Sequence, residues 1–175
     1  YYKDETQTNE VIKDGYFHTG DIGEIDKDGF LKITDRKKEM FKTSGGKYVA
    51  PQILENIFKQ SRFIEQIMVI GDGEKMPAAF IQPAFDFVKE WAIRHSIDLG
   101  STNEDICNNP KVIARIQEDI DEANKKFGNW EQVKRFELTP DIWSIEAGHI
   151  TPTMKLKRKI IKEKYQTVYD KIYRE

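Results

Sequence analysis

The sequence has little cysteine and no long hydrophobic run. Cys107 is the single cysteine among 175 residues, which excludes an internal disulfide framework and a zinc site built from several cysteines. No apolar run approaches the roughly 18 residues that a membrane-spanning helix needs, and the chain shows no signal peptide. We therefore expect a cytoplasmic protein, with peripheral contact at a membrane as an open alternative.

The sequence also has no excess of charge of one sign. The 28 Lys and Arg residues and the 30 Asp and Glu residues give a net charge of −2. Because nucleic-acid binders usually carry a basic excess, we do not expect a nucleic-acid partner. Aromatic residues make up 11% of the chain, which is enough for a packed core. The chain begins at Tyr1 rather than Met, so we expect it to be a segment of a longer protein.

Several common catalytic signatures are missing. The three histidines, His18, His95 and His149, are scattered and form no H-x-x-x-H pair, so we expect no metal site. No serine lies in a G-x-S-x-G motif. Residues 44–47 do not match the Walker phosphate loop, because the required spacing of glycines is absent.

Hydrophobic periodicity and turn signals predict an α+β fold rather than a series of regular βαβ units. Asp28-Gly29 predicts a hairpin turn, and Pro51 and Asn109-Pro110 predict helix starts. We expect a hairpin over 24–34, an extended pair over 41–49, a helix from 51, strands over 67–70, 78–81 and 133–138, and helices over 86–97, 109–128 and 156–173. Residues 1–23 contain only turns and short strands in this interpretation.

Two apolar stripes predict which helix faces are buried. The stripes are Ile113, Ile116, Ile120, Ala123 and Phe127 in one helix, and Leu156, Ile160, Tyr165, Val168 and Ile172 in the other. Their spacing of three to five residues is typical of one helical face.

Two segments in the first part of the chain could bind a nucleotide. In His18-Thr19-Gly20-Asp21, the Asp21 carboxylate can accept hydrogen bonds from both hydroxyls of a ribose. The competing interpretation is a turn with a capping aspartate. In the charged run 35–42, the Arg36 guanidinium can bind a phosphate or ribose oxygen. The competing interpretation is a solvated linker, and we expect a domain boundary at 35–39.

Two further segments could act in catalysis. Gly45 and Gly46 permit a left-handed backbone and close approach of a ligand, although a plain hairpin turn would contain the same residues. Lys155 lies on a loop before a basic segment and could enter the active site of another domain as a cation. Residues 155–164 contain six basic residues and one acid, which leaves a basic surface for nucleic acid or anionic lipid as the alternative.

Together and in this order, the four segments resemble the C-terminal end of the adenylate-forming superfamily. This superfamily contains acyl-CoA synthetases, firefly luciferase and the adenylation domains of nonribosomal peptide synthetases. Residues 15–21 (GYFHTGD) are similar to its G-[WY]-x-x-T-G-D motif, residues 35–36 to its hinge D-R element, and residues 151–158 (TPTMKLKR) to its closing lysine motif. The forms of residues 35–51 and 151–158, and the helices inserted near 85–130, are most similar to long-chain fatty acyl-CoA synthetases.

The resemblance implies a two-step reaction that uses ATP, Mg²⁺ and CoA. A fatty acid and ATP give an acyl-adenylate and diphosphate, and CoA then displaces AMP to give acyl-CoA. It also implies that residues 1–37 are the β-hairpin tail of a large N-terminal domain that binds ATP and the acyl chain. Residues 38–175 would form the small mobile C-terminal domain, a short mixed or antiparallel sheet packed with helices, which rotates between the steps. We expect the isolated chain to be inactive, because the phosphate loop, the adenine pocket and the Mg²⁺ site would lie in the large domain.

The resemblance also assigns roles to single residues in the adenylation step. Asp21 would hold the ribose hydroxyls of ATP, and Arg36 would contact ribose or phosphate. Lys155 would bridge the substrate carboxylate and the α-phosphate. Lys38, two positions after Arg36, would occupy the hinge.

In the thioester step, the loop from Lys42 to Gly46 would line the pantetheine path. This loop is one residue longer than in luciferase-like members, which leaves open whether Gly45 or Gly46 faces pantetheine. Two alternative functions remain open: a basic interaction module that binds nucleic acid or an anionic membrane, and an adenylation domain that loads a carrier protein.

Overall fold

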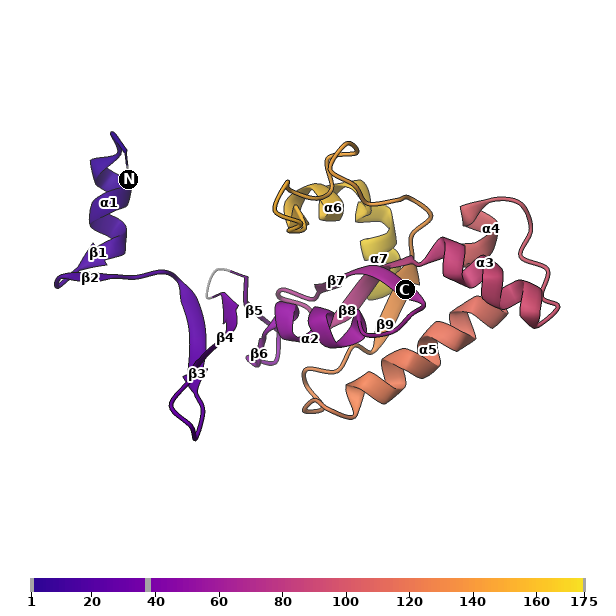
Figure 1. The fold of residues 1–175 in the computed structure, drawn as a ribbon, viewed down its shortest axis with the longest axis horizontal. Coiled ribbons are helices and arrows are strands. Elements are labelled where there is room, and N and C mark those ends of the chain that lie inside the picture. The colour runs from indigo at the N-terminus through magenta and orange to yellow at the C-terminus, as the bar shows by residue number, and fades with distance from the viewer. Residues whose placement is uncertain (1, 37–38, 175) are drawn as a thin grey trace. The chain divides into compact units, whose positions relative to one another are not determined.

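The computed structural model describes residues 2–36 and 39–174, whose contacts divide into two compact units (Figure 1). Unit 1 covers Tyr1–Met40 and unit 2 covers Phe41–Glu175. The sequence analysis placed the boundary after residue 37. None of the helices in the described ranges is long and apolar enough to cross a membrane.

Unit 1 consists of one short helix followed by two antiparallel pairs of strands. Its elements are α1 (Glu5–Val11), β1 (Ile12–Lys13), β2 (Tyr16–Phe17), β3 (Asp21–Ile25) and β4 (Leu31–Arg36). Helix α1 was not expected, so the prediction of turns and short strands alone was wrong here. The helix begins because the Asp4 carboxylate accepts the Gln7 N–H at 2.8 Å. It buries none of its residues, and it therefore carries no amphipathic signal.

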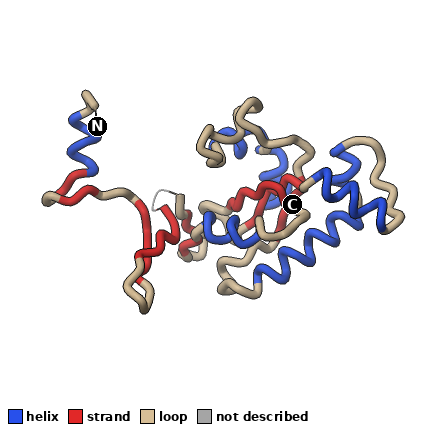
Figure 2. Tube along the Cα trace, viewed as in Figure 1, coloured by secondary structure: helices blue, strands red, loops and turns tan. Residues whose placement is uncertain are grey.

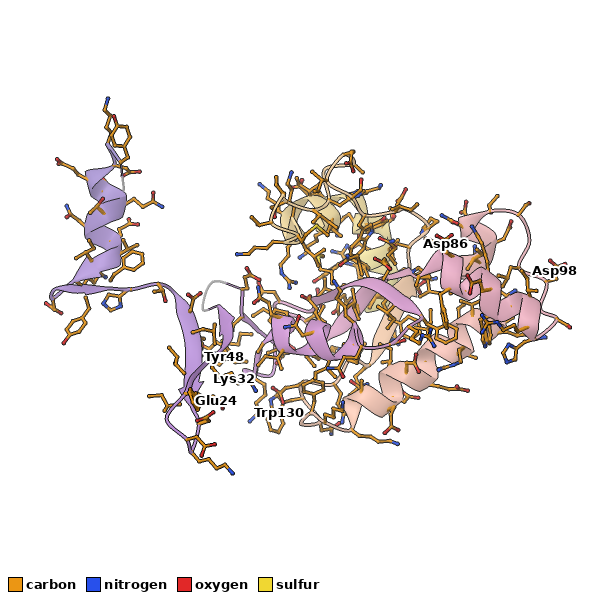
Figure 3. The ribbon with its side chains drawn as sticks, in the orientation of Figure 1. Glu24, Lys32, Tyr48, Asp86, Asp98 and Trp130 are labelled. Atoms are coloured by element: carbon orange, nitrogen blue, oxygen red, sulfur yellow. The ribbon has the colours of Figure 1, made fainter. Side chains whose placement is uncertain are left out.

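The predicted hairpin over 24–34 is confirmed as β3 and β4. The Asp26 carboxylate accepts the N–H groups of Asp28 and Phe30, both at 2.9 Å, which fixes the turn between the strands. Across the strands, Glu24 and Lys32 form an exposed ion pair at 3.8 Å (Figure 3).

Unit 2 is built on a mixed three-stranded sheet, in agreement with the predicted α+β fold (Figure 2). Its elements are β5 (Phe41–Lys42), β6 (Tyr48–Val49), α2 (Pro51–Phe58), β7 (Ile64–Ile70), β8 (Ala78–Pro83), α3 (Phe85–Arg94), α4 (Asn103–Asn108), α5 (Pro110–Asn124), β9 (Arg135–Leu138), α6 (Arg158–Lys164) and α7 (Gln166–Arg174). The strand order is β7-β8-β9, in which β7 and β8 are antiparallel and β8 and β9 are parallel. Because a parallel pair needs a long crossover, helices α3 to α5 occupy the connection between β8 and β9.

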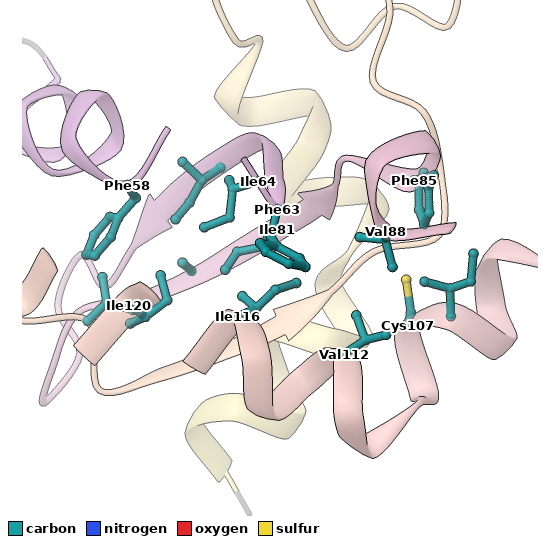
Figure 4. Close-up of a cluster of buried hydrophobic side chains, with 14 of the residues drawn as sticks. Phe58, Phe63, Ile64, Ile81, Phe85, Val88, Cys107, Val112, Ile116 and Ile120 are labelled. Carbon is teal, nitrogen blue, oxygen red and sulfur yellow. The ribbon is translucent and has the colours of Figure 1, made fainter. Parts of the chain in front are cut away.

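The sheet separates two hydrophobic cores. Along β7, Ile67 and Val69 enter the core that α2, α3 and α5 cover (Figure 4), whereas Met68 and Ile70 enter the core that α6 and α7 cover. Successive side chains of a strand point to opposite faces. Burial of both faces explains why residues 67–70 of β7 and 78–81 of β8 are continuous apolar runs rather than alternating patterns.

The buried face of α5 differs from the predicted stripe. Val112 is fully buried, whereas Ile113, which the stripe included, is 38% exposed. The helix ends at Asn124 rather than at 128. The Asn124 side chain is buried, where it donates to the Val133 carbonyl at 2.9 Å and accepts the Val133 N–H at 3.0 Å. A polar residue therefore takes a core position because both of its hydrogen-bonding groups have partners.

The last segment forms two helices, so the prediction of one helix over 156–173 was wrong. Tyr165 separates α6 from α7, with φ −101° and ψ 30°. Its hydroxyl donates to the Asp141 carboxylate at 2.7 Å. The break also changes the buried face, because Ile161 is fully buried whereas Ile160, which the stripe included, is 43% exposed.

A partly buried ion pair joins α2, β7 and the start of α6. Arg158 Nη2 lies 2.6 Å from Glu55 Oε2. Glu55 Oε1 accepts the Val69 N–H at 2.7 Å, and Arg158 Nη1 donates to the Val69 carbonyl at 3.2 Å. Since β7 is an edge strand, the pair binds backbone groups that would otherwise lie open at the edge of the sheet.

We expect Glu55→Ala to lower the free energy of unfolding by about 2 kcal/mol, because it removes the carboxylate that binds the partly buried Arg158 and the Val69 N–H. Urea denaturation measures this loss. Glu163→Ala is the matched control, since Glu163 pairs with Lys159 at 3.9 Å on an exposed face. The control should change stability by less than about 0.5 kcal/mol. Equal effects of the two substitutions would contradict the structural role of the Glu55–Arg158 pair.

Candidate functional site

Lys155 lies on a tight hairpin between β9 and α6. The Thr151 N–H donates to the Lys155 carbonyl at 2.8 Å, and the Lys157 N–H donates to the His149 carbonyl at 2.8 Å. These bonds join the two arms of residues 149–157, which we call the lysine hairpin. The Lys155 side chain is exposed. The hairpin therefore fixes the backbone of Lys155 and leaves its ammonium group accessible to an anionic ligand.

Thr151 and Met154 shape the turn of the lysine hairpin. Thr151 Oγ1 accepts the Lys155 N–H at 3.0 Å and lies 3.1 Å from Thr153 Oγ1. Met154 has a φ of +60°, in the left-handed region that non-glycine residues rarely adopt. Its N–H donates to the Thr151 carbonyl at 2.8 Å. The turn therefore depends on hydrogen bonds within the hairpin rather than on a favourable backbone preference at Met154.

The other basic side chains of this segment are largely engaged inside unit 2. The contacts are Arg158 with Glu55 at 2.6 Å, Lys159 with Glu163 at 3.9 Å, Lys164 with Asp141 at 2.9 Å, and Lys162 over the Tyr169 ring at 4.4 Å. Because acids and an aromatic ring of the same unit take up these charges, the segment offers less free positive charge than its sequence suggests. This weakens the interpretation as a basic binding helix.

The glycine loop between β5 and β6, Lys42 to Gly46, forms the predicted turn. The Thr43 N–H donates to the Lys47 carbonyl at 2.9 Å, and the Gly46 N–H donates to the Thr43 carbonyl at 2.8 Å. Gly46 has a φ of +80°, and a Cβ placed there would meet Lys42 Cε only at 3.7 Å. Backbone conformation, rather than lack of space, therefore favours glycine at this position. Gly45 has no left-handed φ, and a Cβ there would have only Thr43 Oγ1 at 4.0 Å.

The glycine loop is tied to helix α7 through the turn that follows β7. The Ser44 N–H donates to the Glu74 carbonyl at 2.8 Å, and the Gly73 N–H donates to the Lys42 carbonyl at 2.9 Å. The Tyr169 hydroxyl of α7 donates to the Glu74 carboxylate at 2.9 Å. These contacts fix the loop relative to the body of unit 2.

Cations and aromatic rings lie beside the glycine loop. Lys42 Nζ lies 5.6 Å from the centre of the Tyr48 ring, and Lys47 Nζ lies 5.6 Å from that of the Trp130 ring (Figure 3). Such pairs present a flat apolar surface next to positive charge. The sequence analysis considered Lys47 only as the end of residues 44–47, and it assigned no role to Tyr48 or Trp130. No local pattern links Trp130 to Lys47, because the two residues are far apart in the chain.

In unit 1, the register of β3 and β4 places Asp21 opposite Arg36. The two predicted nucleotide-binding positions are thus brought together by backbone pairing. The Asp21 N–H donates to Thr19 Oγ1 at 3.0 Å, and Gly20 has a φ of +77°. The structure describes the backbone of Arg36 but not its side chain. Lys38 lies outside the described residues, so its hinge role stays a prediction.

A polar network with a buried histidine and a partly exposed ion pair lies behind the lysine hairpin. Lys164 Nζ lies 2.9 Å from the Asp141 carboxylate and 3.3 Å from Nε2 of His149, which is 3% exposed. The Tyr165 hydroxyl donates to Asp141 at 2.7 Å and accepts the Trp143 Nε1–H at 3.2 Å. The sequence analysis assigned His149 no role, because none of these partners forms a recognisable motif with it.

The contacts within this network shift the pKa values of His149, Asp141 and Tyr165. Burial lowers the pKa of His149, and the neighbouring Lys164 ammonium lowers it further. Burial alone would raise the pKa of Asp141, but the hydrogen bonds from Tyr165 and Lys164 outweigh it and hold this pKa below its usual value. Burial is also the main reason that the pKa of Tyr165 is raised. At neutral pH, a neutral imidazole therefore lies beside a charged Lys164–Asp141 pair.

Within residues 2–36 and 39–174, no group of three or more His, Cys, Asp or Glu side chains is placed to hold a metal ion.

Comparison with known proteins gives relatives over almost the whole chain. The long-chain-fatty-acid–CoA ligase FadD15 of Mycobacterium tuberculosis is 38% identical over 173 residues, which is 99% of this chain and 29% of that protein. Fatty acyl-CoA synthetase B of Dictyostelium discoideum is 41% identical over 176 residues, or 99% of this chain and 26% of that protein. The chain thus spans less than a third of the length of these relatives.

A solved structure supports the fold. The adenylation domain of a carboxylate reductase from Mycobacterium chelonae is similar with a TM-score of 0.81 and 23% identity, over 100% of this chain and 26% of that one. At this identity the likeness bears on the fold alone. The family profile described as "AMP-binding enzyme C-terminal domain" matches residues 38–175. Since this match covers well over half of the sequence, the chain belongs to the family of AMP-binding enzyme C-terminal domains.

Proposed function

We propose that this chain is the C-terminal part of an AMP-forming fatty acid–CoA ligase and supplies its adenylation lysine. The complete reaction converts a fatty acid, ATP and CoA into acyl-CoA, AMP and diphosphate. The observation that carries the proposal is the exposed Lys155 on a hydrogen-bonded hairpin in a chain that is 38% identical to a fatty acid–CoA ligase. Long-chain fatty acids are the proposed substrates, because the relatives are named for them.

In the first step, a fatty acid carboxylate attacks the α-phosphorus of ATP and diphosphate leaves. The two reactants are both anions, so a cation between them lowers their repulsion and stabilises the charge that develops on the phosphoryl oxygens. Lys155 would provide this cation. Asp21 would accept hydrogen bonds from the ribose hydroxyls, and Arg36, opposite it in the register of β3 and β4, would bind ribose or phosphate.

In the second step, the CoA thiolate attacks the acyl carbonyl carbon and AMP leaves. The glycine loop would line the pantetheine path in this step, with Gly46 giving the turn its left-handed residue and Lys42 at its edge. Lys155 is not needed once the adenylate has formed. Unit 2 would therefore rotate about a hinge at Lys38 between the steps.

Other parts of the active site would lie outside the described residues. Mg²⁺ would neutralise charge on the ATP phosphates, and we derive no step through it from this chain. The acyl tunnel and most of the ATP site would belong to a larger N-terminal domain, so the isolated chain would have no ligase activity. A cytoplasmic location, with the option of peripheral membrane contact, is also a proposal.

We expect Lys155→Ala in the complete enzyme to slow fatty acid-dependent diphosphate release by about 10²–10³-fold, the usual cost of losing one group that stabilises transition-state charge. Thioester formation from supplied acyl-adenylate and CoA should stay within a few-fold of wild type. Lys159→Ala is the control, because Lys159 is an exposed lysine of the same segment. If Lys155→Ala keeps full adenylation activity, Lys155 does not stabilise the transition state of the adenylation step.

We expect Gly46→Val to slow the thioester step by about tenfold or more, because a β-branched residue at φ +80° must distort the loop. Adenylation should remain close to the wild-type rate. Gly29→Val imposes similar backbone strain at φ +86° in the turn of the β3–β4 hairpin and should change neither step. Equal loss of both steps in Gly46→Val would contradict a specific role for the loop in thioester formation.

The same thioester assay tests the carrier-loading alternative. If the complete enzyme requires a carrier protein instead of free CoA, that alternative is favoured.

A further inference from the structure

His149 closes the base of the lysine hairpin. Its carbonyl accepts the Lys157 N–H at 2.8 Å across the hairpin, and its own N–H donates to the Ser144 carbonyl at 3.0 Å. Its side chain is 3% exposed, with Nε2 3.3 Å from Lys164 Nζ. The residue thus links the hairpin and the preceding loop through its backbone, and helix α6 through its ring.

The groups around the ring require a neutral imidazole. The charged groups that face it are Lys164 from α6 and Asp141 from the segment after β9. Lys164 is held by Asp141 at 2.9 Å and has only donors, so Nε2 must accept from it. The proton then lies on Nδ1, which makes no hydrogen bond of ordinary geometry within the described residues, although the backbone of Ile142 is near.

A second proton would convert Nε2 into a donor that points at an ammonium group. Two cations would then lie 3.3 Å apart, one on the buried His149 ring and one on Lys164, whose side chain is 39% exposed, with the Asp141 carboxylate as the nearest counter-charge. An uncompensated buried charge is expensive, so the ring would leave its position or the hairpin would open.

We infer that His149 is a positioning residue for Lys155, and that its neutral imidazole, held by Lys164, keeps the lysine hairpin in the form that adenylation needs. This inference rests on the proposed function. It assigns no contact between His149 and substrate. Protonation of His149 would disable the adenylation step and leave the thioester step, which does not use Lys155.

The direction of the pH effect follows from the burial of the ring. The pKa of His149 is lower in the folded chain than in the unfolded chain. The unfolded or opened hairpin therefore binds the proton more tightly, and the stability of the closed hairpin falls as the pH drops from about 6.5, the ordinary histidine value, toward the lowered pKa. Above that range the hairpin is fully closed.

The test compares the two half-reactions of the complete enzyme from pH 5 to 8, with palmitate and ATP for adenylation and palmitoyl-adenylate with CoA for the thioester step. In wild type, adenylation should fall below about pH 6.5 by up to tenfold per pH unit, the limit for one proton. His149→Gln keeps a neutral acceptor for Lys164 and should remove most of this acid loss, with adenylation at pH 8 within a few-fold of wild type. The thioester step should show the same profile in both proteins.

His95→Gln is the matched control, because His95 is an exposed histidine at the end of α3 in the same unit. It should keep the wild-type acid loss. The thioester step loses rate at low pH in every variant, because the CoA thiol becomes protonated, so its pH profile is compared between variants. The inference is overturned if His149→Gln retains the wild-type acid loss of adenylation, or if His149→Gln changes the pH profile of the thioester step as much as that of adenylation.

Hydrogen–deuterium exchange separates this inference from the proposed function. The amides of Thr151 and Lys157, which hold the hairpin together, should exchange faster in wild type at pH 5.5 than in His149→Gln, after correction for intrinsic rates. This result would support the positioning role even if the protein released no diphosphate with any fatty acid. Equal protection in the two proteins at pH 5.5 would overturn it, whatever the activity.

Discussion

The ion pair between Glu55 and Arg158 is the interaction on which the arrangement of unit 2 depends. It binds both backbone groups of Val69 on an edge strand and fixes the first residue of α6 against α2 and β7. A buried charge pair is not a large source of stability in itself, since desolvation offsets much of its attraction. The pair instead specifies one arrangement of the chain. Because Arg158 lies three residues after Lys155, its contact with Glu55 determines where the lysine hairpin ends and α6 begins.

Two hydrophobic cores on opposite faces of one small sheet give this pair a rigid support. The first core packs α2, α3 and α5 against one face, and the second packs α6 and α7 against the other. The glycine loop is joined to α7 through Glu74 and Tyr169, and the lysine hairpin leads directly into α6. Both candidate segments are therefore attached to the same packed body. A body of this kind can present one segment or the other by moving as a whole, without repacking its interior.

Local signals predicted much of the fold, whereas features that depend on distant contacts were missed. Asp28-Gly29 and Pro51 favour a turn and a helix start through their own backbone preferences, without help from distant residues. The β3–β4 hairpin and helix α2 that they predict are both present. The predicted stripe of α5 correctly contained the buried Ile116 and Ile120 but missed Asn124, which becomes a core residue only because Val133 supplies both hydrogen-bond partners. The break between α6 and α7 lies at Tyr165, whose hydroxyl donates to the distant Asp141, a contact that no local pattern indicates. The same contrast holds for the candidate site. Sequence motifs predicted roles for Lys155 and the glycine loop, but the contacts of His149 and the Lys47–Trp130 pair depend on residues that are distant in the chain.

The lysine hairpin shows how a flexible residue can be prepared for a demanding electrostatic role. Holding a lysine side chain in one conformation costs up to about 2 kcal/mol of rotamer entropy, and ordering its backbone would cost a further 1–2 kcal/mol. The hydrogen bonds of Thr151 and of His149 order the backbone before any substrate arrives. Only the side chain then remains to be ordered when the anions bind. Because Met154 adopts a left-handed backbone at some cost, the hydrogen bonds within the hairpin hold it against a local preference to relax. In the inference above, a neutral His149 supports these bonds, because it accepts from Lys164 without placing a charge on the buried ring.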